Sequence, residues 1–296
     1  MSELVDTFYT ARNLLYLGAF PQALNNLTTL THLDSDQELE KQGLQYRAYI
    51  GQKKYAQVLN EIPETTTTPL LQAIRQLALS SQGKNQENGV VEKLVANPSN
   101  LSNPTFVVVA AQVLSAEGKH EDALRILATH SRNLECVALT AAIFVDIGRA
   151  DLAAKLMARV RAWSEDAPLA QLAEAWTALH VGGAKYTDAY YIFDELAQAS
   201  SVSTARLINA RAVAKLHLAQ YEEAQELLQE ALLKDPNDPD TLANSVVCAS
   251  FMGAPVETRE RYVTQLREVD PAHPFIRDLD AKGAEFDTLA AKYNTL

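Results

Sequence analysis

Apolar and small residues recur with a helical period in paired segments along the chain, most clearly in the segment 206–240. One stripe of such residues runs over 207–218 and a second over 224–232, with Tyr221 between them. The sequence Asp-Pro-Asn-Asp-Pro then ends the second stripe. Small residues where two helices cross let the backbones approach closely. The segment therefore predicts an antiparallel pair of helices joined by a short turn.

The same helix pair recurs along the chain at nearly constant spacing. Short residues on the second helix are 35, 65, 30, 36, 35 and 34 positions apart, and the long step is close to two repeats. A helix-turn-helix repeat of 34 residues with an aromatic turn residue is typical of tetratricopeptide proteins. The sequence therefore predicts an all-α fold: a tetratricopeptide-like solenoid of helical hairpins in a right-handed superhelix, with about eight helix pairs and a C-terminal capping helix. The residues that mark the repeat are Ala23, Val58, Ala123, Ala153, Ala189, Ala224 and Thr258.

One elongated domain is expected to span residues 1–296, with its weakest joint near 97–104. That stretch contains two prolines and lacks apolar periodicity, as is typical of a loop. The repeat before it is degenerate, because its entry, 64–69, is rich in threonine and its helices lack the expected small residues. The last helix, about 275–293, is expected to close the solenoid with a polar face toward water.

Charge and composition narrow the class of partner. The chain has 26 Lys and Arg against 37 Asp and Glu, a formal charge of −11, which disfavours binding to phosphate backbones and anionic lipids. No apolar run approaches the roughly 18 residues that span a bilayer, and the start lacks a secretion-signal pattern. Cys136 and Cys248 stand alone in apolar stretches, so both are expected to be reduced core residues. We therefore expect a cytosolic protein that contacts neither nucleic acid nor membrane directly.

A search for catalytic or ligand-binding motifs gives no candidate. The sequence contains no GxxxxGK[ST], GxSxG, HExxH or GxGxxG motif, and its six histidines are dispersed without metal-ligand spacing. Tyr190, Tyr191 and Phe193 would suit a ligand box, but their helical spacing after Ala189 favours packing between repeats. No catalytic residue, metal, cofactor or small-molecule substrate is expected, which leaves binding to another protein.

The phase of the repeat predicts where a partner binds. In a superhelix of this type the first helix of each pair lines the concave groove. Across the last five complete repeats the groove positions are mostly alanine, valine and leucine, and none is lysine or arginine. Such a groove lacks the cationic donors that hold a peptide carboxylate, and its apolar surface requires a long-lived partner. The residues expected to form the partner-binding groove are Val108, Ala138, Ala142, Val145, Ala178, Val181, Asn209, Val213, Leu216, Ala243, Val247 and Phe251.

Several short stretches carry a family resemblance. They are 16–22 (YLGAFPQ) with Asn25, 46–49 (YRAY), 134–136 (LEC), 188–193 (DAYYIF), 228–232 (LQEAL) and 273–276 (HPFI). By their order and spacing the chain resembles the epsilon subunits of coatomer, the COPI vesicle coat, over nearly its whole length.

The resemblance implies a structural subunit without enzymatic activity. It implies a stable heterodimer with the C-terminal domain of the coatomer alpha subunit and contact with the remainder of coatomer. It further implies a place in the cytoplasm, peripherally on Golgi membranes and COPI-coated vesicles, and a role in Golgi-to-ER retrograde and intra-Golgi transport. No cofactor is implied.

Three alternatives remain open at this stage. Tight closure of the superhelix would bury the groove residues against one another and leave no partner surface. The chain would also suit a tetratricopeptide adaptor or co-chaperone that reads peptides, or a regulatory subunit of an enzyme. High salt discriminates among the partners, because an apolar obligate pair survives it and the capture of an acidic peptide weakens.

Overall fold

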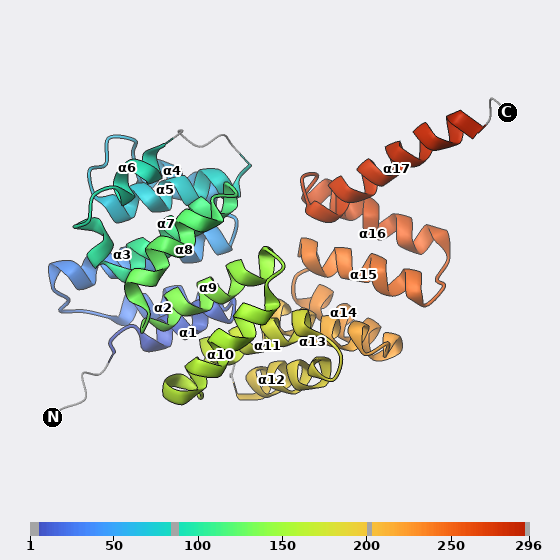
Figure 1. Ribbon diagram of the computed structural model, residues 1–296, viewed down its shortest axis with the longest axis horizontal. Helices are drawn as coiled ribbons and strands as arrows, with labels where there is room; N and C mark the ends of the chain where they lie inside the picture. Colours follow the sequence, from blue (N-terminus) through green and yellow to red (C-terminus); the bar gives the residue numbers. More distant parts are fainter. Residues whose placement is uncertain (1–5, 84–88, 200–202, 294–296) are drawn as a thin grey trace. The chain divides into compact units, whose positions relative to one another are not determined.

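The structure, a computed structural model, describes residues 6–83, 89–199 and 203–293. Every regular element in these ranges is helical, and the helices form consecutive antiparallel pairs (Figure 1). The predicted all-α, tetratricopeptide-like class, with eight helix pairs and a final helix among the described residues, is confirmed. The chain divides into two compact units, Met1–Ile192 and Phe193–Leu296, and the boundary falls inside a helix.

The first unit begins with five complete helix pairs. First helices of successive repeats pack side by side, and α1 also contacts α11, so that the ends of this unit meet. Two short 3-10 turns, Asn100–Ser102 and Ala128–His130, accompany the helices. The pairs are α1 (Tyr9–Tyr16) with α2 (Phe20–Thr29), α3 (Ser35–Gly51) with α4 (Tyr55–Glu61), α5 (Pro69–Ser81) with α6 (Val90–Val95), α7 (Pro104–Ala116) with α8 (His120–Leu127), and α9 (Leu134–Asp146) with α10 (Ala150–Ser164), followed by α11 (Pro168–Val181) and α12 (Lys185–Ala199).

The second unit takes up the end of α12 and adds two helix pairs and a final helix. The pair α13 (Ala205–His217) and α14 (Tyr221–Lys234) is the segment whose pattern is clearest in the sequence. The pair α15 (Pro239–Phe251) and α16 (Val256–Val269) follows, and α17 (Pro274–Tyr293) ends the described chain.

Asparagine caps fix the starts of two helices that carry the candidate site. Asn103 Oδ1 accepts a hydrogen bond from the N–H of Thr105 at 2.9 Å, at the start of α7. Asn133 Oδ1 accepts one from the N–H of Glu135 at 3.0 Å, at the start of α9. Such caps satisfy N–H groups that have no partner within the helix. They place Thr105 and Glu135 in the first turns of their helices.

The residues that mark the repeat lie in the core, as their size predicts. Six of the seven, from Ala23 to Ala224, have at most 1% of their surface exposed. Thr258 is half-buried. Cys136 and Cys248 are buried too, in the position the sequence predicted for them. Burial raises the pKa of the Cys136 thiol to about 12, so it stays protonated near neutral pH.

The degenerate repeat is a packed helix pair, α5 and α6. Ala73 and Ala78 on α5 have no exposed surface, so the small residues expected to be missing from this repeat are found on its first helix. Arg75 Nη1 donates to the carbonyl oxygens of Leu59 at 3.1 Å and Ile62 at 2.9 Å. These hydrogen bonds satisfy the end of α4 and join it to α5.

The predicted weak joint, 97–104, lies inside the first unit. Asn100 Nδ2 donates to the carbonyl oxygen of Leu94 at 2.8 Å and ties this stretch to the end of α6. The division of the chain falls within α12 instead. The single-domain assignment stays a prediction. The sequence also predicts a turn at 80–85 within the degenerate repeat, and this turn lies partly outside the described residues.

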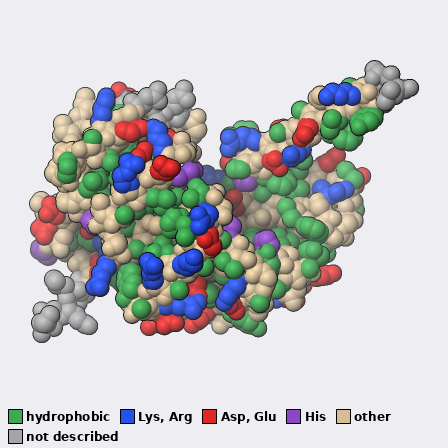
Figure 2. Space-filling view, viewed as in Figure 1, with side chains coloured by type: hydrophobic (Ala, Val, Ile, Leu, Met, Phe, Trp, Pro, Cys, Tyr) green, Lys and Arg blue, Asp and Glu red, His purple; other side chains and the backbone are tan. Residues whose placement is uncertain are grey.

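The final helix, α17, occupies the place predicted for a capping helix. Ile276 near its start is buried, but Leu279, Phe286 and Tyr293 expose 43%, 70% and 73% of their surface. Figure 2 shows apolar side chains among charged ones along this helix. It therefore exposes an apolar face in addition to the expected polar one.

Two glycines offer opposite tests of packing. A Cβ at Gly51, the last residue of α3, would lie 2.3 Å from Cζ of Phe20. We expect Gly51→Ala to lower the free energy of unfolding by about 1–3 kcal/mol, because the Phe20 ring must move. A Cβ at Gly283 in α17 meets no atom within 4 Å, so Gly283→Ala should raise it by about 1 kcal/mol through helix propensity. Urea denaturation measures both changes, and effects of the same sign would show this packing to be misplaced.

Candidate partner-binding site

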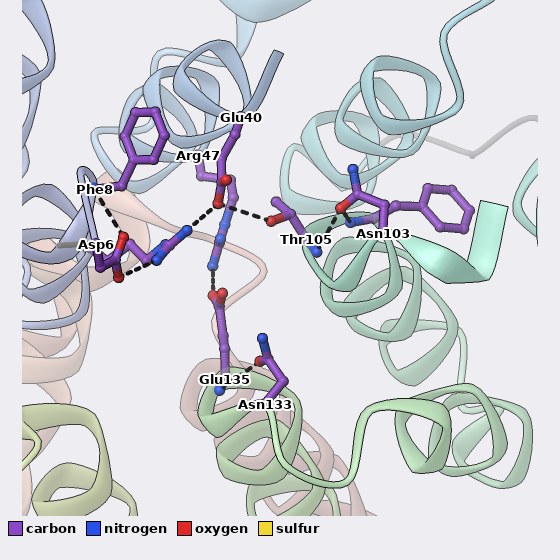
Figure 3. Close-up of polar contacts among 10 residues, drawn as sticks. Asp6, Phe8, Glu40, Arg47, Asn103, Thr105, Asn133 and Glu135 are labelled. Atoms are coloured by element: carbon purple, nitrogen blue, oxygen red, sulfur yellow. Dashed lines mark hydrogen bonds and ion pairs between the residues drawn. The ribbon is translucent and has the colours of Figure 1, made fainter. Parts of the chain in front are cut away.

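A chain of polar contacts joins the first helices of separate repeats in the first unit (Figure 3). Arg12 on α1 pairs with Glu40 on α3 and, through Nη1, with Asp6 at 2.6 Å. Thr105 Oγ1 at the start of α7 donates to Glu40 Oε1 at 3.4 Å. Three successive polar links therefore connect the entry of the chain, α1, α3 and α7.

The central contact is an ion pair between Arg47 on α3 and Glu135 on α9, residues 88 positions apart. Their side chains are only 9% and 16% exposed. Burial alone would lower the pKa of Arg47, but the charge of Glu135 and its hydrogen bond raise the pKa above the ordinary value. Burial, and next the charge of Glu135, raise the pKa of Tyr16 well above its usual range, so the Tyr16 hydroxyl stays neutral near neutral pH.

A cavity of about 410 Å³ lies beside this ion pair, wholly within the first unit. Arg47, Tyr16 and Glu135 line one part of it, and apolar residues of α7, α9 and α11 line most of the rest. Trp176 on α11 contributes to the lining and is 43% exposed. The arrangement can hold an apolar group and hydrogen-bond a polar one.

The structure brings four of the predicted groove residues of the first unit into this cavity. Val108, Ala138, Ala142 and Val145 all line it. Ala142 is exposed and Ala138 and Val145 are half-buried, whereas only 1% of Val108 is exposed. The other two predicted residues of this unit lie on α11: Ala178 is buried at 7% exposure, and Val181 is 48% exposed.

In the second unit the six predicted residues lie on the first helices α13 and α15. Asn209 and Ala243 are buried at 8% and 7% exposure. Asn209 Oδ1 accepts a hydrogen bond from Asn244 Nδ2 at 3.0 Å, which joins the two helices. The remaining four keep some surface: Val213, Leu216 and Val247 are half-buried, and Phe251 is 64% exposed.

Two of these residues already have contacts within the unit. Leu216 packs against a buried cluster that includes Leu228 and Cys248. The Phe251 ring is stacked on that of Tyr221, with centroids 5.1 Å apart and planes 2° from parallel. The open surface of the predicted groove in this unit is therefore centred on Val213, Val247 and the outer part of Phe251.

Four of the twelve residues predicted to bind a partner are instead packed inside the chain. Val108, Ala178, Asn209 and Ala243 are buried within the chain and would contact a partner only after their surroundings opened. For these four the structure agrees with the alternative that the residues are buried against the chain's own helices. Whether any of the twelve binds a partner stays a prediction.

The sequence did not identify the polar residues of the site. Arg47 and Glu135 stand in two of the stretches that carry the family resemblance, but neither falls on a predicted groove position. Trp176 does not fall on one either. The only sequence signal for Arg47 and Glu135 is that both stand in stretches that carry the family resemblance. Their pairing across four repeats leaves no pattern in a single sequence.

The paired helices with small residues at their crossings define a helical-repeat protein of the tetratricopeptide class. A chain of the APC/C hetero-tetramer Cut9-Hcn1 matches with a TM-score of 0.59 at 15% identity, over 91% of this chain and 54% of that one. A tetratricopeptide repeat protein from Parabacteroides merdae matches with a TM-score of 0.57 at 13% identity, over 93% and 96% of the two chains. At these identities the likeness shows the fold alone.

The chain belongs to the coatomer epsilon subunit family. The sequence model described as coatomer epsilon subunit matches residues 4–294. Coatomer subunit epsilon-1 of Arabidopsis thaliana is 36% identical over 276 residues, 92% of each chain. Coatomer subunit epsilon-1 of Oryza sativa subsp. japonica is 35% identical over 275 residues, 92% of this chain and 93% of the relative. Coatomer subunit epsilon of Caenorhabditis elegans is 30% identical over 291 residues, 97% of this chain and 99% of the relative.

Family membership confirms the resemblance found in the sequence. The chain is a component of the COPI coatomer, takes part in vesicle-mediated transport and has the rest of coatomer as its partners. Proteins of this family and fold are generally non-enzymatic. No helix among the described residues is both long and apolar enough to cross a membrane. Those residues also include no cluster of three or more His, Cys, Asp or Glu side chains placed to hold a metal ion.

Proposed function

We propose that this chain is a non-enzymatic scaffold that binds and stabilises the C-terminal domain of the coatomer alpha subunit through the first helices of its repeats. In doing so it would support Golgi-to-ER retrograde and intra-Golgi transport. It would act in the cytoplasm, peripherally on Golgi membranes and COPI-coated vesicles, and need no cofactor.

The observation that carries the proposal is open apolar surface on first helices. Ala142 and Val181 in the first unit and Phe251 in the second are exposed, and Val213 and Val247 are half-buried. Apolar surface of this kind, with lysine and arginine absent from the predicted groove positions, suits a lasting protein interface. The formal charge of −11 supports indirect membrane association, through the rest of the coat.

A charge placed on this surface tests the proposal. We expect Val213→Asp to weaken binding of the alpha C-terminal domain at least tenfold, because binding would desolvate an unpaired carboxylate. Leu233→Asp is the matched control: it makes the same kind of change on α14, where Leu233 is 85% exposed on a second helix. Titration calorimetry in high salt measures both.

Because Val213 is half-buried, the fold must be monitored separately. Val213→Thr, which is close in shape, should stay folded and weaken binding less than Val213→Asp. If Val213→Asp unfolds cooperatively at the wild-type temperature and binds like Leu233→Asp, the first helices of the second unit do not form the interface.

A further inference from the structure

Two residues that line the cavity in the first unit each carry a polar atom that the chain itself leaves unsatisfied. Arg47 donates to Glu135 through Nη2, but its Nη1 is buried and has no hydrogen-bond partner. Gln112 on α7 also lines the cavity, and its Oε1 is buried without a partner. A buried polar atom without a partner is unfavourable by about 1–3 kcal/mol, so both atoms favour a ligand that satisfies them.

The two unsatisfied atoms require hydrogen-bonding groups of opposite kinds. The guanidinium N–H of Arg47 requires an acceptor, and the carbonyl oxygen of Gln112 requires a donor. The main chain of a peptide offers one of each at every residue other than proline. A peptide segment therefore matches these two atoms better than a ligand with acceptors only.

Charge argues against an acidic ligand. Glu135 already neutralises Arg47, and Asp146 adds a second carboxylate to the cavity lining. A carboxylate or phosphate entering here would meet two acidic side chains and only one cation that is already paired. The occupant should be uncharged where it enters the cavity.

The remaining walls are apolar and fit a bulky side chain. The apolar lining includes Leu139, Ala142 and Val145 from α9, and α11 adds Leu172 and Trp176. Its size, about 410 Å³, is at the lower end of the roughly 300–1,000 Å³ typical of ligand pockets. Tryptophan is among the residue types that most often dominate the affinity of a protein interface.

We infer that this cavity is an anchor pocket for one bulky apolar side chain of the alpha C-terminal domain, with the adjoining main chain accepting a hydrogen bond from Arg47 Nη1 and donating one to Gln112 Oε1. The inference rests on the proposed function and adds to it the place and chemistry of one contact. A pocket of this kind fixes the register of the partner, because only one residue of the bound segment fits it.

Filling the pocket tests the inference. Ala142 is exposed and lines the cavity, so Ala142→Phe places a ring where the anchor side chain would bind. We expect it to weaken binding of the alpha C-terminal domain at least tenfold. Ala158→Phe is the control, the same substitution at an exposed position of the second helix α10, and should bind like wild type. Ala138→Leu, a smaller filling change from the same helix, should weaken binding to a lesser extent.

A double-mutant cycle then identifies the anchor. Each bulky apolar residue exposed on the alpha domain is changed to alanine, and binding is measured to wild type and to Ala142→Phe. We expect one alanine variant to weaken wild-type binding at least tenfold and to have little further effect on Ala142→Phe. Wild-type affinity of a folded Ala142→Phe variant, or additive effects at every position, would overturn the inference.

Failure of the inference is distinguishable from failure of the proposed function. If wild type does not bind the alpha C-terminal domain at all, the proposed function is wrong, and so is the inference of an anchor pocket. If wild type binds and Val213→Asp weakens binding while Ala142→Phe does not, the proposed function stands and the anchor pocket alone is wrong.

Discussion

Arg47→Ala is expected to lower the free energy of unfolding by about 3–5 kcal/mol. The change leaves the Glu135 carboxylate without its cation in a site where the Glu135 side chain is only 16% exposed. The loss is large because native domains are stable by only about 5–15 kcal/mol. Guanidinium denaturation followed by circular dichroism measures it.

The expected loss of stability is large because the Arg47–Glu135 ion pair is buried. An exposed ion pair serves as the matched control. Arg125 pairs with Asp122 at 2.7 Å, but its side chain is 72% exposed, so Arg125→Ala should change the stability by no more than about 0.5 kcal/mol. The double variant Arg47→Met with Glu135→Met removes both charges and should recover most of the loss. If Arg47→Ala and Arg125→Ala have equal effects, the ion pair between α3 and α9 does not hold the first unit together.

The helix pairs were predictable because their signal is local. The apolar period of a helix and the aromatic or glycine residues of its turns lie within one repeat, so each repeat could be recognised by itself. The predicted pair over 206–240 corresponds to α13 and α14, and the marker Ala224 has no exposed surface. Even the degenerate repeat was located correctly by counting two periods between Val58 and Ala123, although its small residues lie on the other helix.

The site was less predictable because its parts are far apart in the sequence. Val108 lines the cavity, but its position in the repeat does not reveal its burial, which depends on how tightly α7, α9 and α11 pack. The pairing of Arg47 with Glu135 depends on the curvature of several repeats together. Small changes in the angle between neighbouring repeats add up over such a distance, and no residue pattern records the sum.

The two compact units raise the question of whether the chain unfolds in one step. Phe106 on α7 is 1% exposed and belongs to the largest core cluster of the first unit. Leu266 on α16 has no exposed surface and packs with Leu242 and Ile276 in the second unit. We expect Phe106→Ala to lower the free energy of unfolding by about 3–5 kcal/mol and Leu266→Ala by about 2–5 kcal/mol.

We expect both variants to shift one common transition, because α12 continues without a break through the boundary between the units. Both tryptophans of the chain, Trp163 and Trp176, belong to the first unit, so their fluorescence reports that unit, while circular dichroism reports all helices. Coincident curves from the two probes in wild type and in both variants indicate a single cooperative domain.

Phe286→Ala provides the control for the loss of an aromatic side chain, since Phe286 is 70% exposed on α17 and its removal should leave the transition almost unchanged. Independent folding of the two units would give a different result. If Phe106→Ala moves the fluorescence curve and leaves a second transition in circular dichroism in place, and Leu266→Ala moves only that second transition, then the units fold independently. The chain would then be two domains joined within α12, and a partner bound to both units would be needed to hold them in one arrangement.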